Sequence, residues 1–217
     1  MRRFRARVAR RERGASLLEL MATLALMGIV MGVIFQGIVS TTKATEGAGA
    51  RLQNLDEARV LMATASKDVR TAVRLSAGTS PFTNADTTDA VFYGNIDTTS
   101  APKKIHIYVD AQHRLIEQVW NPDPSSSAPN YTYNTTTPTL RLVGRYVANN
   151  AAKPIFTFLD STGTALGPLP LSAANLIAIK SVGISLIVYK TSPWNQNATT
   201  LVNRVRLPNV DYNAVAN

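Results

Sequence analysis

The chain has 217 residues, no cysteine and a formal net charge of +9 at pH 7. The lack of cysteine excludes disulfide frameworks and thiolate metal sites, so any folded domain is held by packing alone. The first 14 residues contain seven arginines and one glutamate and account for +6 of the +9, which leaves +3 for the rest of the chain. So weak a positive charge gives no support for binding nucleic acid.

An apolar segment follows the basic leader peptide, residues 1–14. No residue from Leu20 to Thr42 is charged. About 20 helical residues, at 1.5 Å each, cross about 30 Å of hydrocarbon, so we predict a transmembrane and assembly helix over residues 15–42. The arginines all precede it, which predicts a cytoplasmic N-terminus and an extracytoplasmic head. An ordinary secretory signal cut near Thr42 is the alternative, although its apolar region is typically only about 7–15 residues long.

The junction between the leader and the apolar segment contains a glycine and a carboxylate. It reads Gly14-Ala15-Ser16-Leu17-Leu18-Glu19. An ionised carboxylate at the edge of an apolar helix is unfavourable without a partner, which makes Glu19 a candidate functional residue. The alternative is that Glu19 lies among lipid headgroups and is solvated there.

This junction resembles the class III signal of type IV prepilins and type II secretion pseudopilins. The resemblance covers the leader and the apolar segment. It implies that a prepilin peptidase cuts between Gly14 and Ala15 on the cytoplasmic side, that Ala15 is N-methylated, and that Glu19 is the fifth residue of the mature chain. The commonest first mature residue of the family is phenylalanine, whereas this chain has Ala15.

The family resemblance also implies partners. Besides the prepilin peptidase, these are other pilins or pseudopilins, an inner-membrane assembly platform and membrane lipid. Glu19 would form an assembly salt bridge with the freed α-amino group of a neighbouring helix, so cleavage would have to precede assembly. Gly28 and Gly32 have the small-xxx-small spacing that lets helices approach closely, although this spacing also arises by chance in a helix rich in small residues.

Residues 43–77 show helical periodicity. After a softer patch at residues 47–49, apolar or small residues recur with alternating spacings of three and four, which predicts an amphipathic continuation of the helix that packs on a sheet. The predicted stripe comprises Leu52, Leu55, Arg59, Met62, Ser66, Val69 and Val73, with Ala58, Ala65 and Ala72 beside it. Arg59 and Ser66 interrupt it and disfavour a long coiled coil. Within this segment, residues 58–76 resemble the corresponding part of J-type minor pseudopilins and W-type minor pilins.

Residues 78–217 predict a β-rich head domain. Apolar residues alternate with polar ones, as in Ile105, Ile107 and Val109, which is typical of a sheet with one covered face. Turn residues at 110–113 and 160–163 predict hairpin loops, and residues 121–139 predict a long exposed loop, either a contact surface or a mobile insertion. The predicted strands are 90–96, 104–110, 114–120, 140–147, 154–159, 177–190 and 201–208, the last resembling the closing strand of the J-type and W-type proteins.

The fold class is therefore α+β, with a long N-terminal helix packed on an antiparallel sheet, as in pilins. No phosphate-binding glycine loop, GxSxG or HExxH motif occurs, and we predict no catalytic residue, metal or cofactor. His106 and His113 are the only histidines. A zinc site would need both of them and a carboxylate, and solvated histidines on a hairpin are the simpler interpretation.

The sequence thus predicts a minor pilin or pseudopilin that is inserted in the inner membrane and later assembled into a type IV pilus or type II secretion pseudopilus, near the tip. The alternative is a stationary single-pass membrane protein whose β head binds a ligand or wall polymer. The mature N-terminus separates the hypotheses, because Ala15 indicates a filament subunit, Met1 a stationary anchor, and a start near residue 45 a secreted domain.

Overall fold

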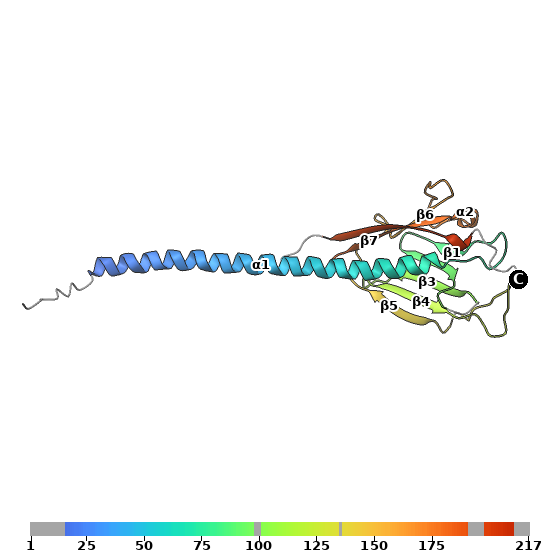
Figure 1. The fold of residues 1–217 in the computed structure, drawn as a ribbon, viewed down its shortest axis with the longest axis horizontal. Coiled ribbons are helices and arrows are strands. Elements are labelled where there is room, and N and C mark those ends of the chain that lie inside the picture. The colour runs from blue at the N-terminus through green and yellow to red at the C-terminus, as the bar shows by residue number, and fades with distance from the viewer. Residues whose placement is uncertain (1–15, 98–100, 135, 191–197, 211–217) are drawn as a thin grey trace, which may run out of the picture. The chain divides into compact units, whose positions relative to one another are not determined.

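The computed structural model describes residues 16–97, 101–134, 136–190 and 198–210 (Figure 1). Gly14 and Ala15 lie outside these residues, as does the rest of the leader. The chain divides into two compact units, Met1–Glu46 and Gly47–Asn217. The helix α1, Leu17–Arg70, contributes residues to both units, which are described separately below.

In the first unit, α1 is an apolar helix with exposed side chains. Its leucines, methionines and alanines are good helix formers. Its large apolar side chains from Leu17 to Ile38 are each 49% or more exposed. Hydroxyl groups are satisfied inside the helix, since each donates to a carbonyl three or four residues earlier, in Thr23, Thr41, Thr42 and Thr45. This pattern suits an environment without water, where every polar group needs an internal partner.

The second unit contains two antiparallel sheets. The first has the order β1-β2-β3-β4-β5 and comprises Phe82–Ala85, Asp89–Gly94, Lys103–Val109, Leu115–Trp120 and Thr139–Gly144. The second has the order β6-β7-β8 and comprises Phe156–Leu159, Ser181–Val188 and Thr199–Arg206. A short helix, α2, spans Ala173–Ala178, and a 3₁₀ turn spans Pro208–Val210.

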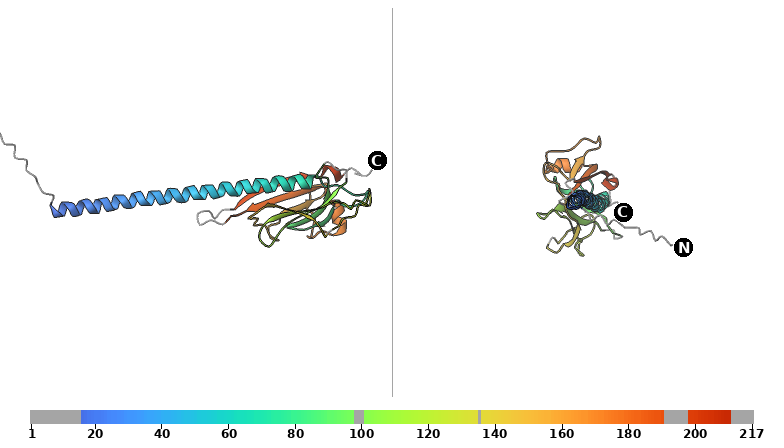
Figure 2. Two further views of the ribbon diagram at one scale, coloured as in Figure 1. Left: turned by 90° about the horizontal axis from the view of Figure 1, so that it is seen from below. Right: turned by 90° about the vertical axis from the view of Figure 1, so that its left-hand side faces the viewer.

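Both sheets share one core with the C-terminal part of α1. Ala58, Leu61 and Val69 are fully buried on the helix, and the same core includes Phe92 of β2 and Ile184 of β7. Viewed along the helix, strands lie on both sides of it (Figure 2). The two sheets also meet directly, because the Phe82 and Phe158 rings pack edge to face with their centroids 5.5 Å apart. The head is therefore a sandwich of two sheets and one helix.

Gly144, the last residue of β5, sets how closely this sheet approaches α1. A Cβ atom at this position would lie 2.6 Å from Glu57 Oε1 and 2.7 Å from Leu61 Cδ2, so a larger residue would force these two side chains to move. Glu57 Oε1 also accepts a hydrogen bond of 2.6 Å from the Arg145 amide. Glycine at this position therefore allows close packing. The Glu57 carboxylate connects α1 to the end of β5 through its hydrogen bond with Arg145.

The predicted α+β architecture is confirmed, and each predicted strand overlaps an observed one. The residues at 110–113 and 160–163 form the expected turns, each organised by an aspartate whose Oδ1 accepts backbone N–H groups. In each turn one residue has positive φ, His113 at 58° and Gly163 at 86°.

Some sequence expectations differ from the structure. The division into two sheets was not indicated, and neither was the four-residue strand β1. The predicted strand at 177–190 begins only at Ser181, because Ser172 caps α2 by accepting a hydrogen bond from the Asn175 amide. In addition, α1 ends at Arg70, whereas the amphipathic continuation was expected to reach residue 77.

The predicted helical stripe is buried at Ala58 and from Met62 to Val73, but two of its members, Leu52 and Arg59, are exposed. Leu52 is 62% exposed rather than packed, and the buried Leu61 was missed. Asp68, which was assigned to the polar face, is only 3% exposed. The buried face of the helix is therefore slightly rotated from the predicted one, and it includes Asp68.

The long loop between β4 and β5 is held by hydrogen bonds within it and by contacts of Tyr133 with the rest of the head. Asp123 and Thr132 are joined by a backbone hydrogen bond of 2.8 Å and a side-chain hydrogen bond of 2.6 Å. The Tyr133 hydroxyl donates to the Pro102 carbonyl at 2.8 Å, and its ring stacks on Tyr93. These contacts favour an ordered surface element over a mobile insertion.

Candidate functional site

Glu19 lies in the N-terminal turn of α1. The Ser16 carbonyl accepts hydrogen bonds from the amides of Glu19 at 2.8 Å and Leu20 at 3.0 Å, so the helix starts directly after Ser16. Ser16 and Glu19 have the spacing of a capping box, and a carboxylate in the first turn also interacts favourably with the helix dipole. Glu19 is therefore compatible with the helix start as well as with a role in assembly.

The Glu19 side chain is exposed. Within the described part of the chain, no basic side chain forms an ion pair with it. In an apolar environment, an ionised carboxylate without a counter-ion is unfavourable.

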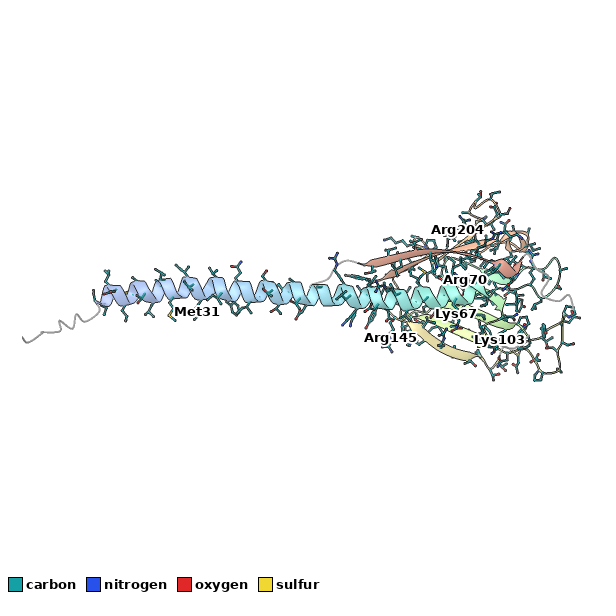
Figure 3. The ribbon with its side chains drawn as sticks, viewed as in Figure 1. Met31, Lys67, Arg70, Lys103, Arg145 and Arg204 are labelled. Carbon is teal, nitrogen blue, oxygen red and sulfur yellow. The ribbon has the colours of Figure 1, made fainter. Side chains whose placement is uncertain are left out.

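The predicted contact glycines lie further along the same helix. Gly28 and Gly32 are four residues apart and so share one face. An added Cβ at either position would meet no atom within 4 Å. The surrounding side chains, such as Met31 in Figure 3 and Phe35, are 55% and 69% exposed. This face is uncovered in the isolated chain, and its use in helix packing stays a prediction.

The two histidines lie in separate environments. His106 Nε2 lies 2.8 Å from Asp89 Oδ2, and its Nδ1 lies 3.0 Å from Gln118 Oε1. His113 Nδ1 lies 3.1 Å from the Val147 carbonyl. Among the described residues, no group of three or more histidines and carboxylates has the arrangement of a metal site.

A buried cluster of charged residues was missed by the sequence analysis. Asp68 of α1 and Glu117 of β4 are 3% exposed each and interact with each other. Arg141 of β5, the register partner of Glu117, contacts Glu117 Oε2 through both Nε and Nη2 and lies 3.6 Å from Asp68 Oδ2. The cluster therefore links the helix to two strands.

Burial, reinforced by the Glu117 charge, raises the pKa of Asp68 from its ordinary value of 3.8 to about 7. The cations Arg141 and Lys67 oppose this shift without cancelling it. Lys67 and Lys103, both labelled in Figure 3, line the same cleft of about 310 Å³ beside the cluster. These contacts hold α1 against the five-stranded sheet. Protonation of Asp68 near neutral pH strengthens them, because it removes the repulsion between the Asp68 and Glu117 carboxylates.

A spacing signal for this cluster exists in the sequence. Leu61, Ala65, Asp68 and Ala72 follow each other at intervals of four, three and four, so Asp68 continues an apolar stripe. Its partners lie 49 and 73 residues further along the chain, which no local pattern indicates.

A family profile described as "Prokaryotic N-terminal methylation motif" matches residues 9–35, the segment that contains Gly14, Ala15 and Glu19. The N-terminus is that of a type IV prepilin-like protein. The match supports the prepilin and pseudopilin superfamily, which was predicted from the same residues. No curated protein sequence matches the chain significantly. The match does not extend to the head, so it gives no information on the subtype of this prepilin-like protein.

The matched motif has general consequences. It implies processing by a prepilin peptidase and assembly with other pilins, and proteins of this family are structural rather than enzymatic. Among the described residues, α1 is the one helix long and apolar enough to cross a membrane, by length and composition. Motif and helix together are consistent with a single-pass protein of the inner membrane.

Proposed function

We propose that this prepilin-like protein is a minor pilin or pseudopilin, cut between Gly14 and Ala15 and assembled through α1 into a type IV pilus or type II secretion pseudopilus. The observation that carries the proposal is a lone carboxylate, Glu19, at the start of an exposed apolar helix inside the matched motif. A position near the filament tip is supported by the resemblance of residues 58–76 and 201–207 to J-type and W-type proteins.

The proposed assembly mechanism follows from electrostatics. In the membrane, the peptidase frees the α-amino group of Ala15, and its methylation leaves the positive charge in place. The Glu19 carboxylate of one subunit then pairs with the amine of a neighbour. Their attraction is strong in surroundings of low dielectric constant and offsets the loss of hydration of both groups. The exposed apolar side chains of α1 exchange lipid contacts for contacts with other helices, and Gly28 and Gly32 allow close approach.

The orientation is also part of the proposal. The arginine-rich leader stays in the cytoplasm, residues 15–42 cross the inner membrane, and the β head lies outside it. Mass spectrometry of the N-terminus tests processing and orientation together. A start at Ala15 supports the filament subunit, whereas Met1 on protein recovered from filaments would contradict it and favour the stationary membrane protein.

Replacement of the cleavage-site glycine tests the proposed processing. In Gly14→Val, the branched side chain next to the scissile bond is expected to exclude the peptide from a peptidase site that accepts glycine. Leader removal is then expected to fall below about a tenth of the wild-type level, which corresponds to about 1.4 kcal/mol or more. The mature N-terminus measured by mass spectrometry reports the result.

Gly37→Val is the matched control for that variant, because it makes the same chemical change at a glycine of α1 away from the cleavage site, and a Cβ at Gly37 meets no atom within 4 Å. It is expected to be cut like the wild type. Equal processing of both variants would show that Gly14 does not define the cleavage site.

A further inference from the structure

Positive charge is concentrated in the C-terminal part of the chain, residues 145–217, which contains the three-stranded sheet. Residues 145–217 contain six basic and two acidic side chains, a net charge of +4, whereas residues 78–144 contain four basic and six acidic ones, a net charge of −2. The weak total charge of the head therefore conceals two halves of opposite sign. A basic half with few carboxylates attracts anions even when the whole domain is nearly neutral.

Three of these cations converge on one cleft. Arg204 and Arg206 are two residues apart on β8 and so point to the same face of the sheet. Their register partners on β7 are Gly183 and Ser181, and Lys180 directly precedes this strand. The open cleft has a volume of about 590 Å³ and is lined by Asp160, Ser161, Lys180, Ser181, Arg204 and Arg206. Its lining carries a net charge of +2.

The Arg204 guanidinium is held in a fixed position. Its Nε and Nη2 atoms donate to Ser181 Oγ at 3.2 and 3.1 Å, and Ser181 itself is 5% exposed. The Gly163 turn lies close to the same group, because a Cβ built at Gly163 would lie 3.0 Å from Arg204 Nη2. A pre-positioned guanidinium loses little entropy when it binds an anion.

The one carboxylate of the cleft is already engaged. Asp160 Oδ1 accepts hydrogen bonds from the Thr162 amide at 2.8 Å, the Thr164 amide at 2.9 Å and the Thr162 hydroxyl at 2.7 Å. These hydrogen bonds lower its pKa and hold it in the turn. Within the described residues, neither Arg204 nor Arg206 forms an ion pair with a carboxylate.

We propose that this cleft binds the phosphate group of a phosphate ester. Arg206 offers the planar guanidinium fork that matches the oxygens of phosphate. The Nε–Nη2 edge of Arg204 is bound to Ser181 Oγ, so Arg204 contributes its positive charge and its Nη1 donor. The cleft volume falls in the range of small-molecule sites, about 300–1,000 Å³, so it accommodates an attached glycerol-sized group as well as the anion. One cleft is too short a track for a nucleic-acid backbone, which needs cations along several nucleotides.

Isothermal titration of the full chain in a non-ionic detergent with sn-glycerol 3-phosphate tests the proposal. Saturable binding that weakens with added salt is expected, and glycerol, the uncharged counterpart, is expected not to bind. Arg206→Gln is expected to weaken binding about tenfold, the effect of one lost charge-assisted hydrogen bond. Arg204→Lys keeps the charge but removes the guanidinium group that Ser181 holds in position, and it is expected to weaken binding as well.

Arg145→Gln is the matched control, because it removes an exposed arginine that Figure 3 places away from Arg204. Binding is expected to be unchanged in this variant, and thermal unfolding of Arg206→Gln is expected to match the wild type. Equal binding of glycerol 3-phosphate and glycerol would overturn the proposal, and so would an equal loss of affinity in Arg206→Gln and Arg145→Gln. Binding of an oligothymidylate without binding of the monoester would overturn it in favour of nucleic acid.

A second titration separates two sources of the same chemistry. Short-chain phosphatidylglycerol below its micelle concentration presents the phosphodiester with a lipid attached. If it binds more tightly than glycerol 3-phosphate, the natural ligand is an anionic lipid headgroup, whereas equal affinities indicate a soluble phosphate ester. Both results support a phosphate site, and this proposal does not depend on the filament function.

Discussion

Glu19→Gln is expected to lower the amount of the protein in filaments at least about 100-fold while leaving removal of the leader unchanged. Glutamine keeps the size of the side chain but removes the charge that pairs with the α-amino group of a neighbour. Removing one partner of a buried ion pair typically costs about 3–5 kcal/mol, and about 1.4 kcal/mol corresponds to a factor of ten. Quantitative immunoblots of sheared filaments and of membranes measure the distribution.

The control for this experiment is Glu46→Gln, which makes the same change in an exposed glutamate of the same helix. It is expected to enter filaments like the wild type. If Glu19→Gln were incorporated normally, the carboxylate would serve only as a solvated group or as part of the helix N-terminus, and the proposed pairing would be wrong.

Asp68→Asn is expected to stabilise the head at pH 8 and to remove most of the pH dependence of its stability between pH 4 and 7. The folded protein holds a proton on Asp68 up to a pKa of about 7, whereas the ordinary value is 3.8. Over this interval the native state binds more protons than the unfolded state, so stability falls as the pH rises. This loss of free energy of unfolding is complete above about pH 7 and amounts to at most about 4 kcal/mol.

Asparagine reproduces the protonated carboxyl because it is neutral at every pH and its amide donates to Glu117. Charged groups of the surroundings, Lys67 of α1 and Arg141 of β5, stay in place. The gain at pH 8 corresponds to a melting temperature about 5–10 °C above that of the wild type for a unit of this size. Thermal unfolding of the detergent-solubilised chain at pH 5 and pH 8 measures it.

Asp56→Asn is the matched control, since its carboxylate lies on the same helix but is 74% exposed. Little change is expected at either pH, because exposed ion pairs contribute at most about 1 kcal/mol. A wild-type head that becomes more stable between pH 5 and pH 8, or an Asp68→Asn variant indistinguishable from Asp56→Asn, would contradict the assigned protonation state.

The features predictable from the sequence are those encoded locally. Alternation at Ile105 and Ile107 predicted the buried face of β3, where both side chains are at most 1% exposed. Asp110 and Asp160 marked the two turns because an aspartate oxygen bonds amides two and four residues on. The candidate role of Glu19 was predictable for the same reason, because it depends on the nearby glycine and on the apolar segment that follows.

The features that were missed depend on residues distant in the sequence. Asp68 was assigned to the polar face because aspartate is rarely buried, and its partner Arg141 is 73 residues away. The basic cleft combines a turn with two strands and was hidden by the small total charge. The start of α2 was missed because Ile177 favours a strand, although Ser172 carries a recognisable capping signal.

The contacts of α1 with β4 and β5 determine how the head resists a pulling force. Glu57, Leu61 and Asp68 lie about one and two helical turns apart, and each is engaged with this sheet, at Arg145, Gly144 and Glu117 respectively. Tension transmitted along the helix would load these attachments in parallel, so none fails before the others. Pulling the head by the two ends of the chain in an optical trap is expected to give a single rupture, whereas stepwise peeling would show that the attachments act separately.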